Sequence, residues 1–126
     1  MPSDALGILL ISGTHERAHY AFVLAAGAAA VGRPVVLFAT NAGCRALLPD
    51  PSGLVGAERD ETLRARGVAG LDELRAAAME LGVRLLACDA GLRMELIPPD
   101  SLLPGAEVAG VPAFLDAVRG GQVISL

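Results

Sequence analysis

The residues best suited to chemistry in this 126-residue chain are its two cysteines, Cys44 and Cys88. Each follows a short apolar run that is typical of a buried strand, and Cys88 stands directly before a helical segment. Backbone N–H groups and the dipole at the start of a helix stabilise a thiolate, which is the nucleophilic form of cysteine. The sequence therefore predicts that Cys88 accepts or donates a sulfur atom, with a packed, chemically inert thiol as the alternative.

The neighbours of Cys88 modify this prediction. Arg93, about one helical turn further on, adds positive charge that favours a thiolate, whereas Asp89 opposes it. Cys44 is a candidate relay or resolving thiol, because two nearby thiols can pass on a persulfide or form a disulfide. The alternative for Cys44 is a packed residue that opens a short helix.

Two histidines form a second cluster. The segment from His15 to His19 matches H-E-x-x-H, the zinc-protease signature, and its histidines share one helix face. A protease is not expected, because the chain has no third histidine and is short for a peptide cleft. A metal site built from these histidines and a cysteine stays as an alternative, but no metal or other cofactor is predicted. Otherwise we expect His15 to tune a neighbouring thiol and His19 to pack.

The composition bounds the class of protein. The length predicts one domain over residues 1–126, and the hydrophobic fraction of 53% exceeds what one small subunit can bury, which predicts a homo-oligomer. The longest uncharged run, residues 18–32, is too short and too rich in Ala and Gly for a membrane span. Residues 1–4 have no basic leader, so we expect reduced cysteines and a cytoplasmic protein. The net charge of −4 indicates no nucleic-acid partner.

Apolar runs alternate with helical segments, which predicts an α/β fold with a parallel sheet. The polar segment 49–67, broken by Pro and Gly, is expected to be a surface lid or insertion, with Glu58, Asp60 and Glu61 on a solvated face. The predicted strands are residues 6–11, 34–39, 83–87, 108–110 and 122–125, and the predicted helices are residues 15–31, 71–81 and 111–119, with brief helices ending near residues 48 and 96.

Ligands of open parallel sheets bind beyond the carboxyl ends of the strands. The segments that leave the first three predicted strands therefore belong to one edge of the sheet. Besides Cys88, the candidate relay or pocket residues on this edge are Thr14, His15, Asn41, Cys44 and Arg93.

Several segments together resemble the DsrE/DsrF-like sulfur-relay family. They are the first strand with the following Ser-Gly-Thr-His-Glu-Arg-Ala, residues 25–35, residues 87–97 with Ala-Cys before a Met-containing helix, and residues 107–115. The resemblance covers nearly the whole chain apart from residues 49–67. It implies a three-layer α/β/α fold with a five-stranded parallel sheet in the order 4-3-2-1-5, assembled as a dimer, trimer or hexamer. In that order the strands before the two cysteines are neighbours, whereas a flavodoxin-like order would put the first strand between them.

The resemblance also implies that the cysteine at position 88 carries persulfide sulfur. The leading hypothesis is therefore a sulfur carrier or sulfurtransferase-like protein, with enzymatic turnover left open. The persulfide would lie between subunits or beneath the insertion, shielded by Leu92 and Met94, and would be exchanged with sulfur donor and acceptor proteins. The competing hypothesis is a non-enzymatic oligomeric module that binds a small ligand or a partner, with Cys88 merely packed.

Overall fold

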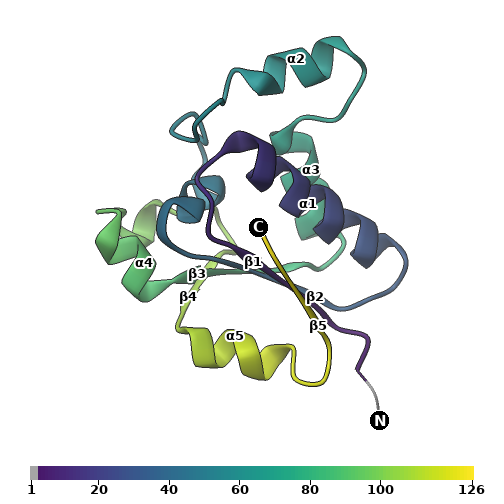
Figure 1. The fold of residues 1–126 in the computed structure, drawn as a ribbon, viewed down its shortest axis with the longest axis vertical. Helices are drawn as coiled ribbons and strands as arrows, with labels where there is room; N and C mark the ends of the chain where they lie inside the picture. The colour runs from purple at the N-terminus through teal and green to yellow at the C-terminus, as the bar shows by residue number, and fades with distance from the viewer. Residues whose placement is uncertain (1–2) are drawn as a thin grey trace.

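A computed structural model describes residues 3–126 as alternating strands and helices (Figure 1). The strands are Leu6–Leu10 (β1), Val35–Ala39 (β2), Arg84–Cys88 (β3), Glu107–Ala109 (β4) and Gln122–Ser125 (β5). The α-helices are His15–Ala30 (α1), Arg59–Ala65 (α2), Leu71–Glu80 (α3), Asp89–Met94 (α4) and Val111–Ala117 (α5), and two 3₁₀ helices span Asn41–Leu47 (η1) and Pro99–Ser101 (η2).

The five strands form one sheet in the order β4-β3-β2-β1-β5, and every neighbouring pair is parallel. This confirms the predicted α/β class and the strand order that the family resemblance implied. Ala39 of β2 pairs with Ala87 of β3, so the two strands end side by side. The segments that carry Cys44 and Cys88 therefore leave adjacent strands.

The larger core lies between the sheet and the helices α1 and α3, which lie together above it in Figure 1. The central strands are apolar on both faces, as parallel strands covered on both sides must be. α1 turns small residues toward the sheet, among them the fully buried Ala18, Ala21 and Ala25. Because these side chains are short, the helix can pack close to the strands.

Within residues 3–126, α5 is the helix that covers the opposite face of the sheet (Figure 1). Its Phe114 stacks on Phe38 of β2, with ring centroids 5.1 Å apart, and Val118 completes the contact. Cys88 and Ala109 pack at the margin of this smaller cluster. Cys88 thus belongs to the α5 side of the sheet, whereas Cys44 is part of the larger core.

Residues 49–67, the segment predicted as an insertion and called the insertion below, fold over the amino end of α1. Val55 forms a parallel bridge with Thr14: its N–H donates to the Gly13 carbonyl (2.9 Å), and its carbonyl accepts from the His15 N–H (2.8 Å). Beyond this bridge the chain forms α2, which sequence reasoning did not predict and which lies outermost in Figure 1. None of the residues of α2 is fully buried, so polar contacts must hold it in place.

No helix within residues 3–126 is both long enough and apolar enough to cross a membrane. Met1 and Pro2, which belong to the segment searched for a leader, lie outside the described residues.

Candidate functional site

Cys88 is the last residue of β3 and at the same time the N-cap of α4. Its backbone is extended, with φ −68° and ψ 121°, and its Sγ accepts a hydrogen bond from the Gly91 N–H at 3.4 Å. The side chain is half-buried, so reagents can reach it. The predicted placement of this thiol, at the exit of the third strand and the start of a helix, is the observed one. The chemical role assigned to it stays a prediction.

Arg93 lies one turn along α4 but is engaged by another residue. Its guanidinium donates to the Asp89 carboxylate at 2.9 Å, and both side chains are largely exposed. Arg93 and Asp89, which were expected to have opposite effects on the Cys88 thiolate, therefore form an ion pair with each other. Because their charges largely cancel, the group that acts on the Cys88 sulfur in the described structure is the Gly91 amide, which donates a hydrogen bond to it.

Cys44 lies in η1 and has no exposed surface. Its thiol donates to the Ala39 carbonyl at 3.5 Å. The pKa of this thiol is raised to about 11, chiefly by burial and then by the proximity of the Cys88 sulfur, against a smaller lowering by the Cys88 backbone amide. The two cysteines are thus brought together as predicted, but Cys44 is held in the protonated form at neutral pH.

Thr14 and Asn41 occupy structural positions at the same sheet edge. Thr14 is the N-cap of α1, where its hydroxyl accepts from the Arg17 N–H at 3.4 Å. Asn41 opens η1 with φ +51°, a left-handed conformation that asparagine tolerates better than most residues. Its backbone packs directly against Gly91 of α4. Asn41 therefore lies beside the Cys88 helix, whereas Thr14 lies beneath the insertion.

His15 contacts the insertion rather than a cysteine. The ring is buried, and its Nε2 lies 2.8 Å from Asp60 Oδ1 of α2. Asp60 also accepts from the Leu71 N–H at 2.8 Å and pairs with Arg64 at 2.8 Å. Partial burial of Asp60 raises its pKa, but these three partners outweigh it and hold the pKa below its usual value.

The expectation of a solvated acidic face is therefore wrong for Asp60, whose side chain is only 20% exposed. This carboxylate belongs to α2 and links it to two other helices. It hydrogen-bonds Nε2 of His15 on α1, and it accepts from the N–H of Leu71, the first residue of α3. A partly buried carboxylate that accepts from several donors is a strong local constraint. It explains how a helix without buried side chains stays docked.

The second histidine of the H-E-x-x-H match packs, as expected. The His19 ring stacks on His15 at 5.7 Å between centroids, and its Nε2 lies 2.9 Å from the Ala69 carbonyl. Over residues 3–126 no group of three or more His, Cys, Asp and Glu side chains is placed to hold a metal ion. The arrangement favours a packing role for the histidine pair.

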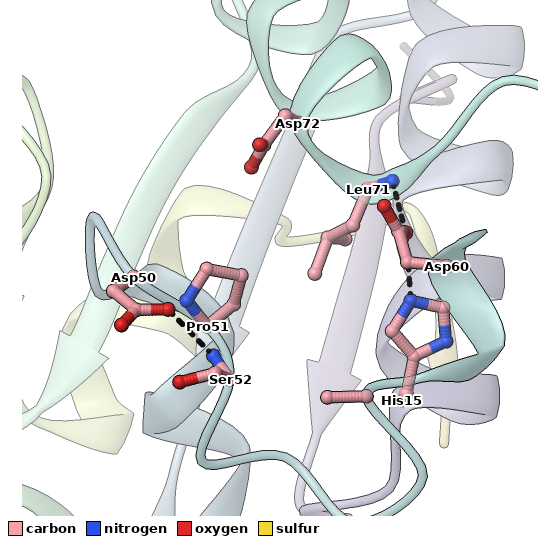
Figure 2. A pocket seen from close by; sticks show the side chains of 8 residues that line it. His15, Asp50, Pro51, Ser52, Asp60, Leu71 and Asp72 are labelled. Carbon is pink, nitrogen blue, oxygen red and sulfur yellow. Dashed lines mark hydrogen bonds and ion pairs between the residues drawn. The ribbon is translucent and has the colours of Figure 1, made fainter. Parts of the chain in front are cut away.

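A cavity of about 190 Å³ lies beneath the insertion. Figure 2 shows Asp50, Pro51 and Ser52 on one side of it and His15, Asp60 and Leu71 on the other. Cys88 is not among its lining residues. Near the thiol, Leu92 is buried as a shielding residue should be, but Met94 is 74% exposed.

Arg75 of α3 is a residue that sequence reasoning missed. It is buried, and its guanidinium donates to the carbonyls of Ala46, Leu48 and Pro49 as well as to Asp72. One side chain thereby fixes the end of η1 and the start of the insertion. The sequence offered one signal, an arginine on the apolar side of a predicted helix, and three of its four partners are backbone carbonyls that no sequence pattern identifies.

Among curated proteins, the chain is similar to the sulfur carrier protein DsrE2 of Allochromatium vinosum, with 26% identity over 92% of this chain and 93% of that protein. It is also 27% identical to the uncharacterized protein YrkE of Bacillus subtilis over 92% of each. No family model matches the chain.

Two solved structures share the fold. The protein of unknown function MTH1491 from Methanobacterium thermoautotrophicum superposes with a TM-score of 0.72 at 17% identity, covering 98% of this chain and all of that one. The YchN protein of Escherichia coli gives a TM-score of 0.69 at 13% identity over the full length of both. These two likenesses show that the chain shares their fold.

Proposed function

Since this chain is related to the DsrE/DsrF-like sulfur-relay proteins, we propose that it is a sulfur carrier whose cargo is a persulfide on Cys88. One observation carries the proposal: in a relative of a named sulfur carrier, Cys88 is a half-buried helix N-cap whose sulfur receives the Gly91 N–H. A hydrogen bond to sulfur and the start of a helix both favour negative charge on that atom.

The transfer step needs no outside oxidant. The Cys88 thiolate attacks the terminal sulfur of a donor persulfide, R–S–SH, and forms a new S–S bond with it. The S–S bond of the donor breaks, its electron pair stays on the inner sulfur, and the donor leaves as the thiolate R–S⁻. Cys88 then carries –S–SH. Delivery to an acceptor thiolate repeats the same exchange with Cys88 as the leaving group, so each carrier cycle is balanced.

The position of Cys88 suits exchange between proteins. Its thiol lies at the junction of β3, α4 and the margin of the α5 cluster, not beneath the insertion. A donor or acceptor protein could therefore approach without displacing residues 49–67. A relay role for Cys44 stays a prediction, and it would require η1 to move, because the thiol is fully buried.

We further propose self-association through the face that only α5 covers. Val111 and Leu115 lie one turn apart on this helix and are 48% and 54% exposed, and Val123 of β5 is 46% exposed. Apolar side chains that remain exposed at one face are typical of subunit interfaces. The cytoplasmic location predicted from the sequence belongs to the same proposal, since a persulfide carrier needs a reduced thiol.

A second candidate function follows from the cavity beneath the insertion. Its volume of about 190 Å³, with Asp50, Asp60 and Asp72 around an apolar floor, suits a small ligand that carries hydroxyl or amine groups. In that case the protein would be a binding module, and Cys88 would be a packed thiol. The two functions differ in whether the protein forms a covalent bond to sulfur.

A loading and discharge cycle tests the carrier function. Reduced protein would be treated with polysulfide without oxygen, freed of excess reagent, weighed by intact mass spectrometry, and then given a small acceptor thiol. A carrier gains one sulfur atom and returns to its starting mass as the acceptor becomes a persulfide. A protein that stays folded and gains no sulfur is not a carrier, and the binding module would then be the better account.

A further inference from the structure

The helix that begins at Cys88 lies unusually close to η1. A Cβ atom built on Gly91 would stand 2.5 Å from the Asn41 backbone nitrogen and 2.8 Å from Thr40 Oγ1. Real Cβ contacts essentially never fall below 3.0 Å, and a backbone atom cannot turn aside as a side chain can. Any other residue at position 91 would therefore force α4 and η1 apart.

The same residue touches the reactive sulfur. The Gly91 N–H is the donor to Cys88 Sγ at 3.4 Å, and the Gly91 carbonyl accepts from the Glu95 N–H at 3.0 Å. At the far end of α4, Glu95 pairs with Arg45 of η1 at 3.3 Å, an ion pair that is partly buried. α4 thus contacts η1 at two places, at Gly91 and at Glu95, and we call these two contacts the seat of α4. The distance between the Cys88 sulfur and the Gly91 amide depends on this seat.

We propose that Gly91 is a positioning residue for Cys88: the absence of a side chain lets α4 sit against residues 40–41, and that seat holds the Gly91 N–H on the sulfur. The inference rests on the proposed function, in which the Cys88 thiolate is the attacking group. A thiolate gains more from a donated hydrogen bond than a thiol does. Moving the amide away therefore removes a hydrogen bond that stabilises the attacking thiolate.

Gly91→Ala and Gly27→Ala form a matched pair for the test. Gly27 lies on the exposed side of α1, and a Cβ there would meet nothing within 4 Å. The readout is the rate of Cys88 alkylation by iodoacetamide as a function of pH, followed by peptide mass mapping. We expect Gly91→Ala to slow alkylation at pH 7 several-fold and to move the rate profile to higher pH. Gly27→Ala should react like the wild type.

A second variant keeps the test decisive if Gly91→Ala does not fold. Glu95→Gln weakens the contact between the other end of α4 and η1 while removing a negative charge from the helix that begins at Cys88. Through charge alone, this change would speed alkylation of Cys88, whereas a loosened seat slows it. Asp116→Asn, which breaks the exposed pair with Arg119 on α5, is the control. A slower Glu95→Gln supports positioning, and a rate equal to or above that of Asp116→Asn overturns it.

Failure of this inference is distinguishable from failure of the carrier function, because alkylation needs no persulfide. Folded Gly91→Ala with wild-type alkylation overturns the positioning role, even if Cys88 carries sulfur. Conversely, slowed alkylation in Gly91→Ala supports the positioning role, even if wild-type protein takes up no sulfur from polysulfide.

Discussion

Cys88 lies close enough to Cys44 to change the pKa of the Cys44 thiol: the Cys88 sulfur raises it, and the Cys88 backbone amide lowers it. The two cysteines nevertheless have opposite environments. Cys44 is enclosed in the larger core and donates to the Ala39 carbonyl, whereas Cys88 is half-buried and accepts the Gly91 N–H. One thiol is therefore a donor kept neutral, and its neighbour is an acceptor within reach of solvent.

The buried thiol of Cys44 should make the protein less stable in alkali. Burial raises its pKa from 9.0 to about 11, so between these values the unfolded chain loses a proton that the folded protein keeps. The free energy of unfolding should therefore fall as pH rises from 9 to 11, by at most about 2–3 kcal/mol. Urea titrations at stepped pH measure this slope. The slope should be reduced in Cys44→Ser, and an unchanged slope would mean that other groups cause it.

Asp60 should control how tightly the insertion is docked. Asp60→Asn removes the carboxylate that faces His15, Arg64 and the Leu71 N–H. We expect faster amide hydrogen exchange and faster proteolysis within residues 49–70, and a loss of stability on the order of 1–3 kcal/mol. Glu61→Gln, on the same helix, is the control. If both variants exchange alike, the carboxylate of Asp60 does not hold the insertion.

The same carboxylate gives stability a dependence on acid. Because the pKa of Asp60 is lowered in the folded protein, its contribution is fully present well above the ordinary value of 3.8 and is lost as pH falls below it. Wild-type stability should fall more steeply than that of Asp60→Asn over this acid range, as measured by urea titration. Parallel slopes would contradict the assignment.

The capping role of Cys88 can be separated from its chemistry. Serine at position 88 still offers an acceptor to the Gly91 N–H, whereas alanine does not. Cys88→Ser should therefore be more stable than Cys88→Ala by about 1 kcal/mol, as typical for loss of an N-cap. Equal unfolding free energies would show that the Sγ contact contributes nothing to α4.

Arg75 should not tolerate lysine. Its planar guanidinium reaches three carbonyls and Asp72 together, whereas an ammonium at the end of a flexible chain cannot match that fork. We expect Arg75→Lys to lose about 2 kcal/mol or more of unfolding free energy. Arg66→Lys, at an exposed position, should change little. A near-neutral Arg75→Lys would mean that the carbonyls find other partners.

The sequence predicted the sheet because its strands are short apolar runs between helical segments, and this periodicity reflects burial on both faces. The same reasoning missed α2. Its residues, 59–65, are mostly charged and bury nothing fully, so they show no apolar stripe. The helix is held instead by Asp60, whose partners are 45 residues upstream and 11 residues downstream in the chain.

At the candidate site, the placement of Cys88 before a helix was predictable because a strand exit and a helix start are both local patterns. The seat of α4 on η1 was not. Nothing in the sequence around Gly91 distinguishes it from other glycines. Its close approach to the Asn41 backbone in the structure shows why a side chain does not fit there. Likewise His15 was expected beside a thiol, since sheet-edge position alone does not reveal that it turns toward the insertion.

The most direct test of the central claim compares intact masses of wild type, Cys44→Ser and Cys88→Ser after polysulfide treatment of the reduced proteins. Cys88→Ser keeps an acceptor for the helix cap, so it serves as a folded protein without the proposed carrier sulfur. We predict that wild type and Cys44→Ser each gain one sulfur atom and that Cys88→Ser gains none. Sulfur uptake by Cys88→Ser equal to that of the wild type, or no uptake by any of the three folded proteins, would contradict a persulfide on Cys88.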